Sequence, residues 1–128
     1  MEKINVYLDD WRLAPEGWVQ AWNVEELVAI FENPKYDVIR LSLDNDLGND
    51  ENNNPLLEGI DFVKLFIERG YTCHKIYFHT ANSTAKNNMI FDLESAKKHG
   101  VISESIGIVK VGYPKSKGNR GDVFNDLF

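Results

Sequence analysis

The sequence predicts one α/β domain over residues 1–128, with a five-stranded, mostly parallel sheet covered on both faces. Three observations indicate this class. Five short hydrophobic runs are typical of buried strands, amphipathic helical patterns alternate with most of them, and neither an internal repeat nor a domain linker interrupts the chain. Strands that alternate with helices are joined by right-handed crossovers, and such crossovers produce parallel sheets.

The first half of the chain contributes two strands and one helix. A strand is expected over residues 3–8, where apolar residues fall on both faces. The proline and glycine within residues 9–17 indicate a loop or a single helical turn, and residues 18–22 then read as a short strand. Asn23 is a favourable N-cap for the following helix, which ends before Pro34.

The second half continues the alternation of strands and helices. Strands are expected over 37–43, 75–79 and 106–111, and helices over 58–69 and 85–99. The polar stretch 48–55 lacks core-forming residues, which predicts a loop. The tail over 113–128 is glycine-rich and basic, and it predicts a loop with no more than a last helical turn.

Composition narrows the classes of function. The chain has 128 residues, enough for a proper core, and 43% are hydrophobic. A net charge of -6 argues against an extended nucleic-acid surface, although a small phosphorylated ligand can still be held locally. The single cysteine, Cys73, excludes an intramolecular disulfide. Because neither a signal pattern nor a membrane-spanning apolar run occurs, no membrane association and a cytoplasmic location are expected.

Motifs of several enzyme classes are absent. The sequence contains no phosphate-binding loop, no Gly-x-Gly-x-x-Gly fingerprint and no nucleophile elbow. Nucleotide triphosphatase, dinucleotide oxidoreductase and serine hydrolase activities therefore lose support.

Two acidic clusters directly follow predicted strands. Asp9 and Asp10 come after the first strand, and Asp44 and Asp46 come after the third. Ligands of open α/β sheets bind at the carboxyl ends of strands, so the clusters are expected to converge. Crowded carboxylates repel one another unless a hard cation such as Mg²⁺ neutralises them. Asp9, Asp10 and Asp44 are candidate metal ligands, which leaves a further carboxylate as nucleophile or general base; the alternative is that these aspartates cap helices or turns.

Polar side chains at the ends of the other strands have two interpretations each. Thr80 and Asn82 either hydrogen-bond a phosphate or cap the next helix. His79 is either a proton shuttle or a hydrogen-bonded core residue. Lys110 either pairs with a phosphate or the acidic cluster, or leaves the strand into solvent. Arg12 suits bidentate phosphate contact, or pairing with the aspartates before it.

The order of these groups resembles that of response-regulator receiver domains. Those domains carry an acidic pair after the first strand, a phosphorylated Asp after the third, Thr or Ser after the fourth and Lys after the fifth. The matching residues here are Asp9-Asp10, Asp44, Thr80 and Lys110. The resemblance implies a receiver-like, or flavodoxin-like, three-layer sandwich with the first helix shortened and the last helix reduced.

A closer resemblance is to the cyclic-phosphate processing receiver domain family. Its pattern Leu-Asp-Asp-x-Arg-x-x-Pro-x-Gly-Trp is matched by residues 8–18. Its pattern Leu-Ser-Leu-Asp-His-Asp-Leu-Gly is matched by residues 41–48, with Asn45 in place of the histidine. Its third motif, His-Ser-Ala-Asn-Pro followed by Asn-Met, is similar to residues 79–83 and 88–89.

This resemblance implies a metal-dependent phosphoesterase that processes cyclic-phosphate nucleotides or RNA 2′,3′-cyclic phosphate ends, with Mg²⁺ as cofactor. The expected roles are metal binding by Asp9, Asp10 and Asp44, catalysis by Asp44, Asp46 and His79, and phosphate binding by Arg12, Thr80, Asn82 and Lys110. If the family histidine does acid–base work, an amide cannot replace it, because amides do not titrate near neutral pH.

Two alternatives remain open at this point. The chain is either a non-catalytic or phospho-accepting receiver-like module for binding or signalling, or a scaffold for protein interaction. The expected partner is a small phosphorylated nucleotide or an RNA end, and the sequence does not identify protein partners.

Overall fold

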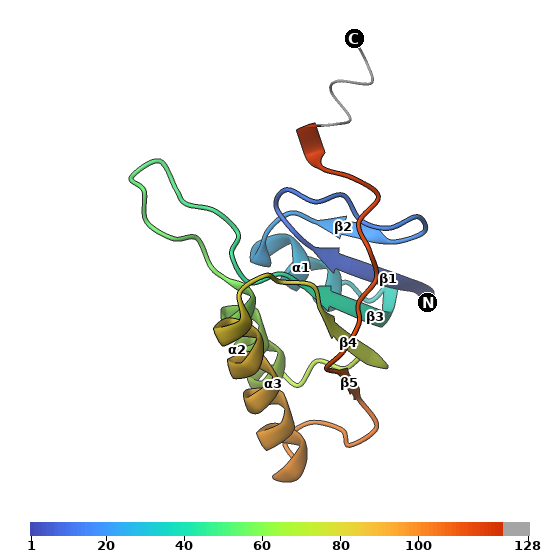
Figure 1. The fold of residues 1–128 in the computed structure, drawn as a ribbon. Coiled ribbons are helices and arrows are strands. Elements are labelled where there is room, and N and C mark those ends of the chain that lie inside the picture. The colour runs from blue at the N-terminus through green and yellow to red at the C-terminus, as the bar shows by residue number, and fades with distance from the viewer. Residues whose placement is uncertain (122–128) are drawn as a thin grey trace.

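The computed structural model describes residues 1–121, in which the chain forms five strands and three helices (Figure 1). Their order is β1 (Glu2–Leu8), β2 (Val19–Ala21), α1 (Val24–Glu32), β3 (Tyr36–Leu43), α2 (Gly59–Glu68), β4 (Lys75–Phe78), α3 (Ser83–Lys98) and β5 (Gly107–Val109). All strand pairs are parallel, and the strand order is β2-β1-β3-β4-β5. This is the flavodoxin-like order, so the predicted receiver-like α/β fold with a five-stranded sheet is confirmed.

The three helices lie on one face of the sheet. The connections that contain helices all run in the same direction across the sheet, and right-handed crossovers then place their helices on the same side. Phe31 of α1 packs against Phe62 and Phe66 of α2, and α2 runs beside α3 (Figure 1). The sheet contributes alternate buried residues to this core, among them Val6, Leu8, Leu41, Leu43, Ile76 and Phe78.

Two irregular segments cover the other face. Tyr7, Ser42 and Tyr77 lie in register on neighbouring strands, and the ring of Trp18 meets both tyrosines edge-on at 6.2 and 6.3 Å. Trp18 ends the segment 9–18, which joins β1 to β2 without a helix. The third layer of the predicted sandwich is therefore irregular here, as expected from the shortened first helix.

The second covering segment is the tail segment, defined here as residues 113–121. It runs back across the sheet after β5 (Figure 1) and is fastened to segment 9–18 by backbone hydrogen bonds. Leu13 N–H donates to the Gly118 carbonyl at 2.9 Å, and Arg120 N–H donates to the Trp11 carbonyl at 2.7 Å. The prediction of a loop with no more than a last helical turn covers residues 113–128, and residues 122–128 of that range lie outside the described residues.

The boundaries of the elements differ from the predicted ones by a few residues. Helix α3 begins at Ser83 because the Asn82 side chain caps it, accepting a hydrogen bond from Ala85 N–H at 3.0 Å. None of the helices within residues 1–121 is long and apolar enough to cross a membrane.

Candidate active site

The two acidic clusters meet at the carboxyl edge of the sheet. They line one pocket of about 230 Å³, called the acidic pocket below. Its lining residues are Asp9, Asp10, Trp11, Arg12, Asp44, Asp46 and Ala81. Strands β1 and β3 are neighbours, and Asp44 N–H donates to the Leu8 carbonyl at 3.0 Å, so both clusters leave the sheet side by side.

Local hydrogen bonds turn the chain sharply after β1. The Asp9 carboxylate accepts from the backbone N–H groups of Trp11 and Arg12 at 2.8 and 2.7 Å. An aspartate that bonds to the backbone two and three residues ahead closes a turn. This turn brings the Arg12 side chain back over the carboxyl edge.

Two glycines allow the acidic clusters to approach neighbouring backbone. Gly48 has a φ of +88°, and a Cβ there would also lie 3.2 Å from Asp10 Oδ2. At Gly59, the first residue of α2, a Cβ would lie 2.2 Å from the Asp44 carbonyl oxygen. Any side chain at Gly59 would therefore push the start of α2 away from the backbone that carries Asp44.

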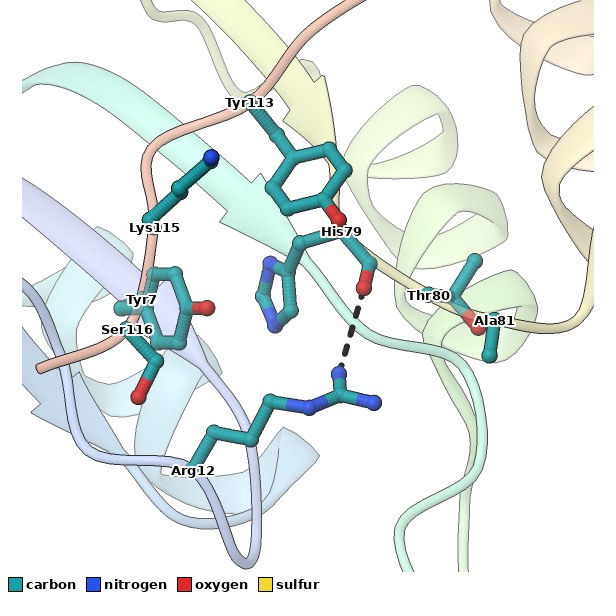
Figure 2. A pocket seen from close by; sticks show the side chains of 8 residues that line it. All are labelled: Tyr7, Arg12, His79, Thr80, Ala81, Tyr113, Lys115 and Ser116. Carbon is teal, nitrogen blue, oxygen red and sulfur yellow. Dashed lines mark hydrogen bonds between the residues drawn. The ribbon is translucent and has the colours of Figure 1, made fainter. Parts of the chain in front are cut away.

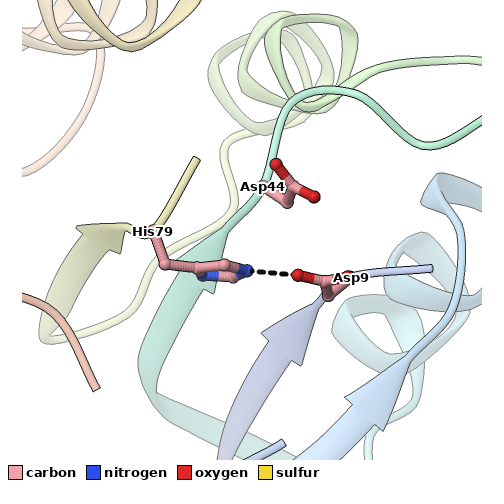
Figure 3. Close-up of side chains that lie close together, drawn as sticks. All are labelled: Asp9, Asp44 and His79. Carbon is pink, nitrogen blue, oxygen red and sulfur yellow. Dashed lines mark hydrogen bonds and ion pairs between the residues drawn. The ribbon is translucent and has the colours of Figure 1, made fainter. Parts of the chain in front are cut away.

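His79 is buried beneath Asp9 and uses both ring nitrogens (Figure 3). Nε2 lies 3.0 Å from Asp9 Oδ2, and Nδ1 lies 2.7 Å from Ser42 Oγ. An ionised carboxylate only accepts hydrogen bonds, so Nε2–H donates to Asp9 and Nδ1 accepts from the Ser42 hydroxyl. The imidazole also stacks on the Tyr7 ring, with the centroids 3.9 Å apart. Burial lowers the pKa of His79 although the Asp9 carboxylate opposes this, so the ring is neutral.

The carboxyl groups of the acidic pocket ionise unequally. Burial disfavours the charge of Asp9, but hydrogen bonds from His79 and from two backbone N–H groups lower its pKa below the usual value. Burial and then the Asp9 charge raise the pKa of Asp44 to about 6. The same two causes raise the pKa of Asp10. Nearby positive charge would therefore favour the ionised forms of Asp10 and Asp44.

Arg12 supplies part of that charge. Its Nη1 lies 3.4 Å from Asp9 Oδ2 and 4.0 Å from Asp44 Oδ2, and it also donates to the His79 carbonyl at 3.2 Å. The predicted pairing of Arg12 with the preceding aspartates is thus seen for Asp9, and the contact extends to Asp44.

The donor set of the pocket fits a hard divalent cation. Asp9, Asp44 and His79 can each place one ligand atom within 4.8 Å of the others. The imidazole already has a partner at each nitrogen, and Mg²⁺ prefers oxygen. The carboxylates of Asp9 and Asp44, with Asp10 in the same pocket, are therefore the fitting ligands.

Thr80, Asn82 and Asp46 lie around the same pocket. The Thr80 side chain lies close enough to Asp44 to lower the pKa of that carboxyl group, against the larger effect of burial. Asn82 caps α3, and its Nδ2 donates at 3.5 Å to Asp46 Oδ2. The Asp46 side chain is exposed at the pocket, so among the three predicted catalytic residues it is the one open to solvent.

Lys110 and Asn45 do not line this pocket. Lys110 pairs with Glu94 of α3, with Nζ 2.5 Å from Oε1, and its role toward phosphate stays a prediction. Asn45 is buried, its Oδ1 accepts from Ile60 N–H at 3.0 Å, and its Nδ2 donates to Glu58 at 2.9 Å. Asn45 thus ties the Asp44 loop to the first turn of α2. Its Nδ2 also donates to Asp46 Oδ1 at 3.2 Å, so the residue that replaces the family histidine contacts both this helix and a carboxylate of the acidic pocket.

A second pocket of about 280 Å³, called the tail pocket below, adjoins the acidic one (Figure 2). Its lining residues are Tyr7, Arg12, His79, Thr80, Ala81, Tyr113, Lys115 and Ser116. Arg12 and Ala81 line both pockets. The sequence did not reveal Tyr7 or the three tail residues as site residues, because only the folded tail segment brings them to β1 and β4. The one signal available was the basic character of the tail.

Comparison with known proteins found one family. The model of a family described as the cyclic-phosphate processing receiver domain matches residues 4–95. Neither a curated protein nor a solved structure matches the chain significantly. The matched range includes every residue of the acidic pocket and stops before Tyr113, Lys115 and Ser116 of the tail pocket.

Proposed function

The chain belongs to the cyclic-phosphate processing receiver domain family, and on this basis we propose that it hydrolyses cyclic phosphates with the help of a divalent cation. The substrate would be a cyclic-phosphate nucleotide or an RNA 2′,3′-cyclic phosphate end, and Mg²⁺ the cation. The observation that carries the proposal is the acidic pocket, where four aspartates and Arg12 surround one space at the carboxyl edge.

Each group of the pocket has a role in this reaction. Mg²⁺ held by Asp9, Asp10 and Asp44 would neutralise charge on the phosphate. Arg12, Thr80 and Asn82 supply hydrogen-bond donors that orient phosphate oxygens. Lys110 would have to release Glu94 before it could join them.

Proton transfer is assigned to Asp46. One water adds to phosphorus, the bond from phosphorus to one ribose oxygen breaks, and that oxygen takes a proton, so that a phosphomonoester is formed. Asp46 is exposed in the pocket and can accept the proton of the water or donate one to the leaving oxygen. His79 is buried with both nitrogens engaged, so its role is to position Asp9.

Hydrolysis of adenosine 2′,3′-cyclic phosphate, followed by ³¹P NMR with and without Mg²⁺, tests the proposal. We expect turnover that requires Mg²⁺ and falls to background in Asp44→Asn. Asp37→Asn is the matched control, since Asp37 lies at the opposite end of β3 and outside the acidic pocket. Full activity of Asp44→Asn would reject the assignment.

A phospho-accepting receiver is the second candidate. The observation that favours it is that Asp44 lies in one pocket with the acidic pair Asp9-Asp10, with Thr80 close enough to lower the pKa of Asp44. Treatment with acetyl phosphate and Mg²⁺ should then add one acid-labile phosphate to Asp44, detected by mass spectrometry. Incorporation at another residue, or none, would rule this candidate out.

A further inference from the structure

We propose that the tail pocket is a phosphate-binding subsite, so that the substrate carries a second phosphate group besides the cyclic one. The identity of the first phosphate rests on the proposed function. The second phosphate is either the phosphodiester that precedes a cyclic end or a 5′-phosphate of the same nucleotide.

The charges of the two pockets are opposite. Four of the seven residues that line the acidic pocket are aspartates. Among residues 1–121, no carboxylate lines the tail pocket, and the two charged residues that line it are Arg12 and Lys115. In a chain with a net charge of -6, a pocket with this lining favours an anion.

Lys115 is available to such an anion. Its side chain stands beside Tyr113 at the edge of the pocket (Figure 2), and among residues 1–121 no ion pair engages it. Lys110, by contrast, already pairs with Glu94. Lysine binds phosphate as a point charge, and the hydroxyls of Tyr7 and Tyr113 add hydrogen-bond donors.

Arg12 connects the two pockets. It lines both of them, and its Nη1 is held by Asp9 on one side and by the His79 carbonyl on the other. A guanidinium has five N–H donors, so phosphate groups in both pockets can contact it at once. One ligand with two phosphate groups would therefore bridge the site across Arg12.

Tyr113, Lys115 and Ser116 form the wall that the tail segment contributes to the tail pocket, and this segment is held in place. Leu13 and Gly118 share a backbone hydrogen bond of 2.9 Å, and the Arg120 guanidinium lies over the Trp22 ring, 4.4 Å from its centroid. Because Tyr113, Lys115 and Ser116 lie beyond the matched residues 4–95, the family model does not describe this wall. The subsite is thus assigned from the structure of this chain.

Amide NMR titration with inorganic phosphate, without a divalent cation, tests the subsite directly. We expect saturable shifts at Tyr113, Lys115, Ser116 and residues 79–81 that persist in Asp44→Asn and disappear in Lys115→Gln. Lys117→Gln is the matched control, because it removes the same charge from the same segment outside the pocket. Shifts that are absent, lie elsewhere, or weaken equally in both lysine variants would overturn the proposal.

Three nucleotide probes then identify the source of the second phosphate. Adenosine 2′,3′-cyclic phosphate has one phosphate, its 5′-phosphorylated form has two, and a dinucleotide ending in a cyclic phosphate has a phosphodiester as the second. For each two-phosphate probe, we compare its affinity with that of adenosine 2′,3′-cyclic phosphate. The ratio of these two affinities should fall about tenfold in Lys115→Gln and stay unchanged in Lys117→Gln. Whichever two-phosphate probe shows this loss reveals the source.

Failure of this inference can be told from failure of the proposed function. If inorganic phosphate binds through Lys115 but no cyclic phosphate is hydrolysed, the subsite stands and the hydrolase does not. If cyclic phosphates are hydrolysed but the affinity ratio is the same in Lys115→Gln, the hydrolase stands and the subsite is rejected.

Discussion

At the scale of single residues, the buried charge of Asp44 in the acidic pocket lowers the stability of the folded state. The residue is 8% exposed and lies beside the ionised Asp9, and burial and this charge together raise its pKa from 3.8 to about 6. In the unfolded chain the group ionises at its ordinary pKa. Above pH 6 the folded state therefore carries a charge that is less favourable there than in the unfolded state.

Asp44→Asn should therefore stabilise the free protein at pH 7. A shift from 3.8 to about 6 corresponds to at most about 3 kcal/mol, and we expect a gain of about 1–3 kcal/mol in the free energy of unfolding. The gain should shrink as the pH falls from 6 to 4, because the folded wild type then protonates Asp44. Urea denaturation at pH 4 and pH 7 measures this. A gain that is equal at both values would contradict the charge explanation.

His79→Gln tests whether His79 positions Asp9 or transfers protons. Loss of a residue that orients a metal ligand typically costs about 10–100-fold in metal affinity. We expect Mg²⁺ affinity and turnover to fall together, with the shape of the pH–rate profile unchanged. His99→Gln is the control, since His99 is exposed on the far end of α3. Loss of one limb of the profile at unchanged Mg²⁺ affinity would instead make His79 an acid–base catalyst.

At the scale of elements, helix α2 fixes the loop that carries Asp44. Its N-terminus is bound to that loop through Asn45, and Gly59 packs directly on the Asp44 carbonyl. A change at the start of α2 therefore reaches the acidic pocket without altering any carboxylate.

Gly59→Ala should damage the site through this contact. The new Cβ would overlap the Asp44 carbonyl oxygen, so we expect a loss of about 1–3 kcal/mol in stability and weaker Mg²⁺ binding. Gly107→Ala makes the same chemical change where a Cβ would lie 3.3 Å from the flexible Lys75 side chain and 3.5 Å, an ordinary contact distance, from the His74 carbonyl oxygen. Thermal denaturation and Mg²⁺ titration of both variants would decide this, and equal behaviour would disprove the role of Gly59.

The elements were largely predictable, but the contacts between distant segments were not. Hydrophobic runs and caps indicated the five strands and three helices, because these signals are local. Whether Lys110 or Lys115 is placed to contact a phosphate depends on where the tail segment crosses the sheet. A glycine-rich stretch carries no local sequence signal for that path. Likewise Asn45 follows Asp44 directly, yet its side chain turns to α2 because the first-turn N–H of Ile60 needs a partner.

At the scale of the whole molecule, the acidic pocket links ligand binding to stability. A cation bound only by the folded state stabilises it by about 2.7 kcal/mol at a hundredfold excess over Kd. We expect the Tm to rise saturably with Mg²⁺ in wild type and in Asp37→Asn but not in Asp44→Asn, as measured by differential scanning fluorimetry. An equal rise in Asp44→Asn would place the cation elsewhere.

The sequence separation between the residues of the tail pocket bears on the order in which the molecule folds. The helices and β1, β3 and β4 pack through connections of moderate length, whereas the tail pocket joins Tyr7 to Ser116 near opposite ends of the chain. Contacts between distant segments form late in folding, because closing a long loop costs entropy before any contact is gained. We therefore expect the chain to build the carboxylate-lined sheet edge first and to complete the tail pocket only when residues 113–121 dock.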